Sequence, residues 1–156
     1  FVVTKKQKMG QAFYNLYLNE LAEKVTEGWV IILDDDSKLI DDKFIECLAE
    51  KCDESKENDV LIYKVKYSKG VLPPDKFFIN NPIVKGKIDM ACFCVHSSLF
   101  HKIKFGPNKC GDFSFLTKIQ ESGEYNIRCI ELPIGIWANY EGPAGGNAAG
   151  PKVKKK

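Results

Sequence analysis

The chain has 156 residues, of which 44% are apolar and 28% charged, and its formal net charge is +2. This length and composition predict one globular domain with a hydrophobic core. A charge this close to zero gives no strong field toward nucleic acid, and the aromatic residues fall on apolar faces rather than among Lys and Arg. We therefore expect no nucleic-acid partner. No apolar run approaches the length that crosses a bilayer, so we also expect no membrane span.

The cysteines indicate a reducing setting. None forms a C-x-x-C pair, and with only two histidines in the chain a zinc site is not expected. Cysteines in such a pattern are usually small buried hydrophobic residues, which favours a cytoplasmic enzyme with free thiols. The six are Cys47, Cys52, Cys92, Cys94, Cys110 and Cys129.

The N-terminal part is expected to alternate between strand and helix. Phe1–Thr4 is a short apolar strand candidate, and apolar residues then recur at helical spacing over 11–24. The apolar run 29–33 predicts a buried strand. Asp41 or Asp42 can cap the helix that follows.

The rest of the chain continues the alternation. Residues 60–67 predict a strand that becomes half exposed, and 88–95 predict another. Between them, 71–87 reads as a long irregular loop of the kind that often carries function. A helix is expected from Gly111-Asp112, and a last strand over 125–132. This order predicts a single α/β domain with a mixed, mainly parallel sheet flanked by helices.

The expected domain spans residues 1–141. Residues 142–156 are rich in Gly, Pro and Lys and cannot bury a core, so we expect a flexible tail. Its lysines could contact phosphate or an acidic surface, although a solvated tail is the commoner role of such a charge run.

An acidic run gives the chain its strongest functional signal. The apolar stretch Val30–Leu33 leads directly into Asp34, Asp35 and Asp36. Adjacent like charges repel and are tolerated only in water or around a cation. At the end of a strand in an α/β sheet, they predict a divalent metal site that holds an anionic ligand such as a nucleotide diphosphate. A solvated acidic turn is the equally balanced alternative.

The acidic run and four other segments, Gly10–Asn15, 88–95, Gly111–Leu116 and Ile136-Trp137, occur in an order that resembles one enzyme family. That family is the nucleotide-sugar glycosyltransferases of the GT-A (Rossmann-like) fold. In that family, a Gly-x-Ala-x-x-Asn helix precedes an apolar strand that ends in a D-x-D motif, as Gly10–Asn15 and the acidic run do here. Residues 88–95 resemble the "DMAGFAV" segment of the proteoglycan-linkage glucuronosyltransferases. Gly111–Leu116 falls where the catalytic base opens a helix, and Ile136-Trp137 matches a late Trp. The resemblance covers Thr4 to Glu141.

The resemblance implies a metal-dependent transferase. Asp36 would bind Mn²⁺ or Mg²⁺ directly, and Asp34 and Asp35 would hold the ribose or a metal-bound water. Hard oxygen ligands suit these cations, which stabilise a diphosphate leaving group as Lewis acids. The donor would be a UDP-sugar, and the acceptor a hydroxyl of a glycan or glycoprotein.

The remaining site residues follow by the same resemblance. Asp112 would be the general base for an inverting transfer, with a helix N-cap as its structural alternative. Asp89 would bind sugar hydroxyls, or would be only a strand-edge carboxylate. Lys8 would help to neutralise phosphate, unless its basic loop is merely solvated, and Asn15 would belong to the donor site.

The chain departs from the family pattern at three points. The nucleoside-binding strand and helix expected before Phe1 are missing, and Tyr14 stands where the family has Arg before Asn15. Ala138 follows Trp137 where related enzymes often place His; His96 is a possible substitute, although a structural role is commoner for such a residue.

Two other function classes compete with this prediction. A nucleotidyltransferase also needs acidic strand ends and divalent metals, but normally has a Gly-rich or basic phosphate loop near its start. A non-enzymatic cation-binding or interaction module is the second alternative. The EF-hand form of such a module fails because Lys38 occupies a ligand position and no Gly follows.

Overall fold

The computed structural model describes residues 14–107, 110–138 and 140. The predicted strand Phe1–Thr4, Lys8 and the tail 142–156 lie outside these residues. The helices are α1 (Tyr14–Ala22), α2 (Lys43–Asp53), α3 (Asp75–Phe78), the 3-10 helix η1 (Met90–Cys92), α4 (Ser97–Lys102) and α5 (Gly111–Ser122). The strands are β1 (Trp29–Ile31), β2 (Lys38–Leu39), β3 (Asp59–Ile62), β4 (Val65–Tyr67), β5 (Gly70–Leu72), β6 (Phe93–His96), β7 (Asn126–Cys129) and β8 (Ile136–Trp137).

The strands form two small mixed sheets, so the prediction of a mainly parallel sheet was wrong. The first sheet has the order β1-β6-β3-β7, and only β3 and β7 are parallel. The second has the order β2-β8-β4-β5, and only β4 and β8 are parallel. Helical crossovers predict parallel neighbours, but β4 and β5 are joined by a hairpin and β6 runs opposite to both of its neighbours.

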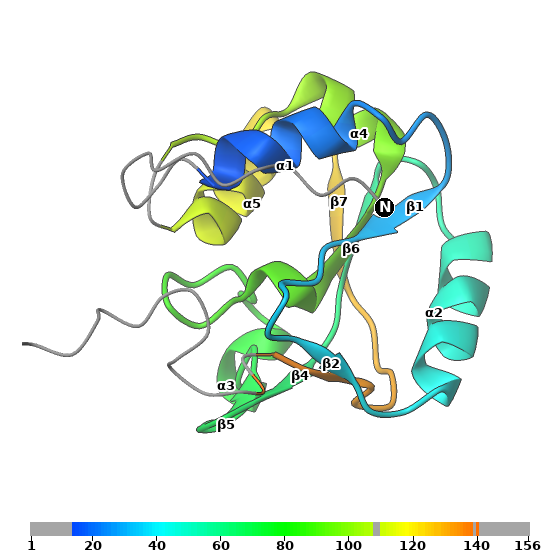
Figure 1. The fold of residues 1–156 in the computed structure, drawn as a ribbon, viewed down its shortest axis with the longest axis vertical. Coiled ribbons are helices and arrows are strands. Elements are labelled where there is room, and N and C mark those ends of the chain that lie inside the picture. Colours follow the sequence, from blue (N-terminus) through cyan, green and yellow to red (C-terminus); the bar gives the residue numbers. More distant parts are fainter. Residues whose placement is uncertain (1–13, 108–109, 139, 141–156) are drawn as a thin grey trace, which may run out of the picture.

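Helices cover both faces of the first sheet, which confirms the α/β class. Side chains alternate between faces along β6. Cys94 lies toward α2, with its Sγ 4.0 Å from that of Cys52, whereas the Phe93 ring stacks on Phe115 of α5 at 6.0 Å. Figure 1 shows α2 on one side of this sheet and α1, α4 and α5 on the other, with the second sheet below. None of the helices in the described part is long and apolar enough to cross a membrane.

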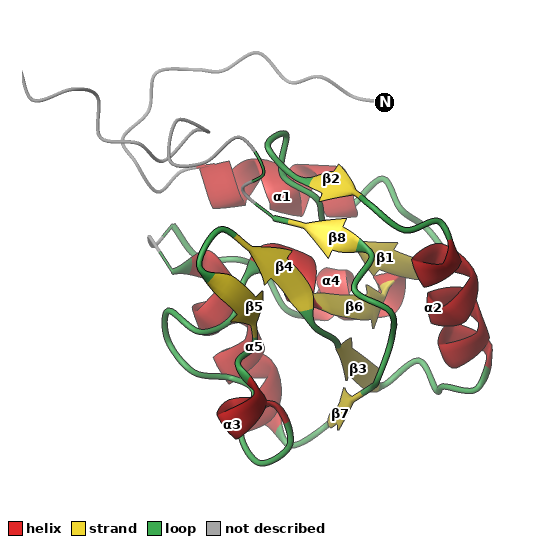
Figure 2. Ribbon diagram, turned by 90° about the horizontal axis from the view of Figure 1, so that it is seen from below, coloured by secondary structure: helices red, strands yellow, loops and turns green. Residues whose placement is uncertain are grey.

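The second sheet accounts for most local differences from the predicted elements. The single strand expected over 60–67 is divided, because the chain leaves the first sheet after Ile62 and joins the second at Val65 (Figure 2). The loop expected over 71–87 contains part of β5 and all of α3. The strand expected over 88–95 begins as η1.

The strand after Gly28 is shorter and less buried than predicted. Pairing ends at Ile31, and Leu33 is 38% exposed. β1 is an edge strand among the described residues, so only one of its long edges is paired with a neighbour. The prediction that the cysteines are free thiols is confirmed for all six, and Cys52, Cys92 and Cys94 are also buried as expected.

A buried carboxylate fastens the parallel pair β3–β7. Asp59 is 4% exposed and accepts hydrogen bonds from the Lys56 N–H at 3.0 Å, Asn126 Nδ2 at 3.1 Å and Arg128 Nη1 at 3.0 Å. Burial alone would raise the pKa of Asp59, but these donors and the Arg128 charge hold it below its ordinary value. The stabilisation is therefore present above the unfolded-state pKa and is lost as pH falls through the lower folded-state pKa.

Replacing Asp59 tests this clamp. Asp59→Asn should lower the free energy of unfolding at pH 7 by about 2–3 kcal/mol, because charged donors lose their acceptor. Chemical denaturation measures the change. The exposed Asp53→Asn on α2 is the matched control and should leave stability nearly unchanged; equal effects of the two substitutions would contradict the clamp.

Candidate active site

The acidic run forms a tight turn between the two sheets. The Ser37 N–H donates to the Asp34 carbonyl oxygen at 2.9 Å, which places Asp35 and Asp36 at the centre of a β-turn. The Asp36 carbonyl oxygen accepts a hydrogen bond from the Tyr140 N–H at 2.6 Å. The alternative of an acidic turn is therefore correct in form, but the turn is tied to the segment that follows β8.

The pairing of β1 with β6 brings a second acidic residue to this turn. Trp29 lies opposite His96 and Ile31 opposite Cys94, so the end of β1 adjoins the start of β6. Asp89 precedes η1 at that end, and its Oδ1 accepts a hydrogen bond from the Ala91 N–H at 3.1 Å. The carboxylates thus meet through antiparallel pairing and not at the carboxyl ends of parallel strands.

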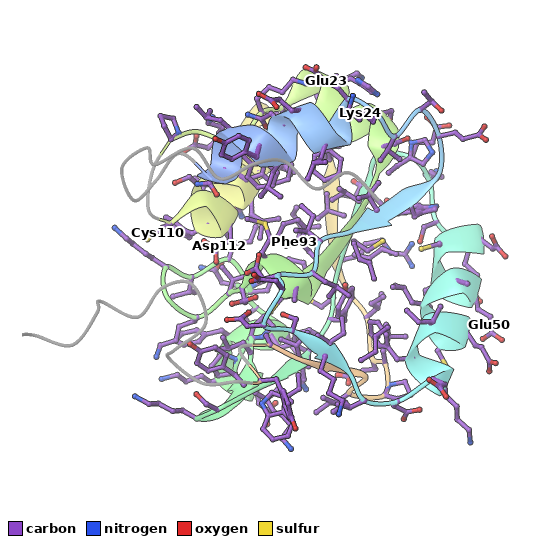
Figure 3. The ribbon with its side chains drawn as sticks, in the orientation of Figure 1. Glu23, Lys24, Glu50, Phe93, Cys110 and Asp112 are labelled. Atoms are coloured by element: carbon purple, nitrogen blue, oxygen red, sulfur yellow. The ribbon has the colours of Figure 1, made fainter. Side chains whose placement is uncertain are left out.

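Asp112 lies in the first turn of α5 (Figure 3). It is close enough to Asp34 and Asp89 for their charges to affect one another. Its Oδ1 accepts a hydrogen bond from the Phe113 N–H at 2.7 Å. The N-cap position belongs to Cys110, whose side chain makes no capping bond, so the expected alternative of Asp112 as the N-cap is wrong. Among the described residues, no side chain donates a hydrogen bond to the Asp112 carboxyl group.

Electrostatic coupling shows that the carboxylates share one site. Partial burial raises the pKa of Asp34 to about 6, and the charges of Asp89, Asp36, Asp35 and Asp112 add to this rise. Asp34 keeps contact with solvent, which limits how far burial and the neighbouring charges can raise its pKa. Burial also raises the pKa of Asp112 to about 6, with a contribution from Asp89, and burial and Asp36 raise that of Asp89. Repulsion of this kind makes the site a place for positive charge.

The chemistry of these side chains suits a hard divalent cation, but they do not form a finished cage. Across residues 14–107, 110–138 and 140, no group of three or more His, Cys, Asp or Glu side chains is placed to hold a metal ion. Mg²⁺ and similar ions commonly use one or two carboxylates and take their remaining ligands from water and substrate phosphates. Asp34 and Asp36 can supply such a pair.

Two asparagines on α1 hold the segment that leads to Asp112. Asn19 accepts a hydrogen bond from the Phe105 N–H at 2.8 Å and donates one to the Phe105 carbonyl oxygen at 3.0 Å. Asn15 donates to the Gly106 carbonyl oxygen at 3.2 Å. A Cβ on Gly111 would come within 2.4 Å of the Asn15 amide, so glycine lets the start of α5 approach α1. These contacts set the direction in which α5 begins.

Asn15 is fully buried, so it supports the start of α5 from the interior and does not line the surface of the site. Asn19 is a residue that the sequence reasoning missed. Its signal was the spacing Asn15-x-x-x-Asn19, which puts two amides on one side of a helix.

The other predicted residues are dispersed. His96 lies at the far end of β6, where its Nδ1 is 2.9 Å from Ser98 Oγ and its ring packs on Trp29, which indicates the structural role. Trp137 lies in the second sheet opposite Lys38, with Lys66 Nζ 3.7 Å from its ring centroid. Lys8 lies outside the described residues.

In comparisons with protein-family models and with curated proteins, nothing matches this chain.

The raised pKa of Asp112 predicts a stability effect. A carboxyl whose folded-state pKa exceeds its unfolded-state value stabilises the fold at low pH and loses that contribution as pH rises, here between 3.8 and about 6. Asp112→Asn keeps an acceptor for the Phe113 N–H and removes the charge. It should raise the free energy of unfolding at pH 7 by about 1–2 kcal/mol, the full shift being discounted for partial exposure.

Denaturation of the metal-free protein at pH 4 and pH 7 measures this difference. Glu50→Gln on the outer side of α2, labelled in Figure 3, is the charge-matched control and should change little at either pH. Destabilisation by Asp112→Asn at pH 7 would contradict a charge-strained site.

Proposed function

We propose that this chain is a metal-dependent glycosyltransferase that moves a sugar from a nucleotide-diphosphate donor, a UDP-sugar, to a sugar hydroxyl with inversion. One observation carries the proposal: carboxylates from three separate segments gather at one place, and the pKa values of Asp34, Asp89 and Asp112 are raised there. Such strain is costly to the fold and is characteristic of functional sites. The resemblance of the sequence to GT-A glycosyltransferases supplies the reaction class.

The acidic turn is the proposed cation site. Asp36 and Asp34 would hold Mn²⁺ or Mg²⁺, and Asp35 at the exposed centre of the turn is available to the ribose. The bound cation would act as a Lewis acid that stabilises negative charge on the diphosphate leaving group. Its charge would also relieve the repulsion among the carboxylates.

Asp112 is the proposed general base. In the transfer, the acceptor oxygen forms a bond to the anomeric carbon while the bond from that carbon to the phosphate oxygen breaks. The diphosphate leaves with the bonding electron pair, and the Asp112 carboxylate takes the proton from the acceptor hydroxyl. A pKa of about 6 suits this role, because the group is ionised at neutral pH and is more basic than an ordinary aspartate. Asp89, whose Oδ1 is already bonded to the Ala91 N–H, would use its other oxygen to orient a sugar hydroxyl.

Binding of the donor tests the acidic turn. In calorimetric titration, UDP should bind in the presence of Mn²⁺ and much more weakly without it, and Asp36→Ala should abolish the metal-dependent part. Asp42→Ala removes a nearby exposed carboxylate that makes no capping bond, and should bind UDP as the wild type does. Mn²⁺-dependent binding that survives in Asp36→Ala would overturn the ligand assignment. A wild type that binds no UDP with Mn²⁺ would contradict the proposed donor.

Turnover tests the base. Asp112→Asn should leave Mn²⁺-dependent binding of UDP intact and slow sugar transfer by roughly 10²–10⁴-fold, the usual contribution of a general base. The rate is followed by release of UDP from a UDP-sugar in the presence of acceptor. Because the same substitution is expected to stabilise the fold, a loss of activity cannot be ascribed to unfolding. Equal activity in the variant and the wild type would leave Asp112 a structural residue.

A further inference from the structure

A cavity of about 360 Å³ includes Asp89 in its lining, and the proposed transfer assigns no role to its other walls. Its walls come from the β4–β5 hairpin and from the segment that leads into η1. Tyr67, Lys69 and Leu72 belong to the hairpin side, whereas Lys87 and Asp89 belong to the other. A concave site with apolar and aromatic walls and a few convergent polar groups is the usual form of a small-ligand site.

The charges of this cavity are unbalanced. Lys69 and Lys87 are both exposed, and neither forms an ion pair or a side-chain hydrogen bond within the described part of the chain. By contrast, Lys66 and Lys38 on the same sheet each lie over an aromatic ring. Two unpaired ammonium groups at one cavity favour a ligand that carries negative charge.

The backbone of the cavity is also open. Gly70 begins β5 just after the hairpin turn with φ of +132°, and the opposite segment turns at Gly86 with φ of +71°. A Cβ at either position would meet no atom within 4 Å, so neither glycine is required by close packing. Both glycines line the cavity, and no side chain fills the space beside either of them.

We propose that this cavity is the acceptor subsite and takes a sugar that bears an acidic group. The acidic group would lie between Lys69 and Lys87, the apolar face of the sugar would pack on Tyr67, and a hydroxyl would reach Asp89. This assignment rests on the proposed function, because only a transferase needs an acceptor.

The position of the cavity favours the acceptor over the donor diphosphate. None of Asp34, Asp35 and Asp36 lines it, although they form the proposed cation site. The cavity adjoins that site only through Asp89, whose charge raises the pKa of both Asp34 and the general base Asp112. A ligand seated in the cavity therefore lies next to the reacting groups and leaves the acidic turn to the donor.

Binding of a matched pair of probes tests the subsite. Methyl β-glucuronide and methyl β-glucoside differ only at C6, which is a carboxylate in the first and a hydroxymethyl group in the second. Their affinities can be measured by NMR titration of the metal-free full chain. The glucuronide should bind more tightly than the glucoside. The double variant Lys69→Met/Lys87→Met should weaken the glucuronide by about tenfold, as expected for lost charged hydrogen bonds, and leave the glucoside unchanged. The control Lys24→Met/Lys43→Met removes two exposed lysines elsewhere and should bind both probes as the wild type does.

Two results would overturn the proposal: equal affinity for both probes in the wild type, or unchanged affinity for the glucuronide in the Lys69/Lys87 variant. Displacement of the glucuronide by UDP with Mn²⁺ would reassign the cavity to the donor and overturn it as well. Glucuronide binding that depends on these lysines, in a protein that fails to bind UDP, would support the cavity as an acidic-sugar site while contradicting the proposed transferase. The two proposals can therefore fail separately.

Discussion

The antiparallel register between β1 and β6 is the constraint on which the candidate site depends. Because Ile31 lies opposite Cys94, the acidic turn that follows β1 adjoins the residues that precede β6. Asp89 is one of those residues, and without this register it would have no reason to lie near Asp34. A slip of one residue would also exchange the faces of β6, so that Phe93 and Cys94 would leave their packing partners. Packing on the two faces of the first sheet therefore fixes the β1–β6 register, and the register places Asp89 near the acidic turn.

The rest of the fold opposes the repulsion that this arrangement creates. Behind Asp112, the ring of Phe115 on α5 stacks on Phe105 with centroids 4.0 Å apart and on Phe100 at 5.5 Å. From the other direction, Asn19 fixes both polar groups of the Phe105 backbone. Apolar packing and the hydrogen bonds of Asn15 and Asn19 thus hold the start of α5 in place, although the carboxylates that it approaches would be more stable apart.

The second sheet follows the acidic turn in the chain and forms one wall of the cavity that contains Asp89. It carries the chain directly from the acidic turn into β2, and it places the β4–β5 hairpin with Tyr67 beside the cavity that ends at Asp89. The proposed cation site and the cavity adjoin each other at Asp89, which lines the cavity but is not a proposed cation ligand. Under the proposed function they would bind two ligands of different charge next to each other. This division matches a reaction with separate donor and acceptor, in which the transferred group passes between neighbouring sites.

The sequence by itself determined the α/β class, the helices near 14–22 and 43–53, and the acidic run 34–36, because these follow from local periodicity and from an unusual run of charge. Asp89 and Asp112 were expected at the site only through the resemblance to a family. It did not determine strand direction, the division of 60–67 between two sheets, or the role of Asn19. Those depend on which strands pair and on what a side chain meets after the chain has folded. Convergence of Asp34, Asp89 and Asp112 was likewise decided only by the tertiary structure, since residues so far apart in sequence are brought together by register and packing alone.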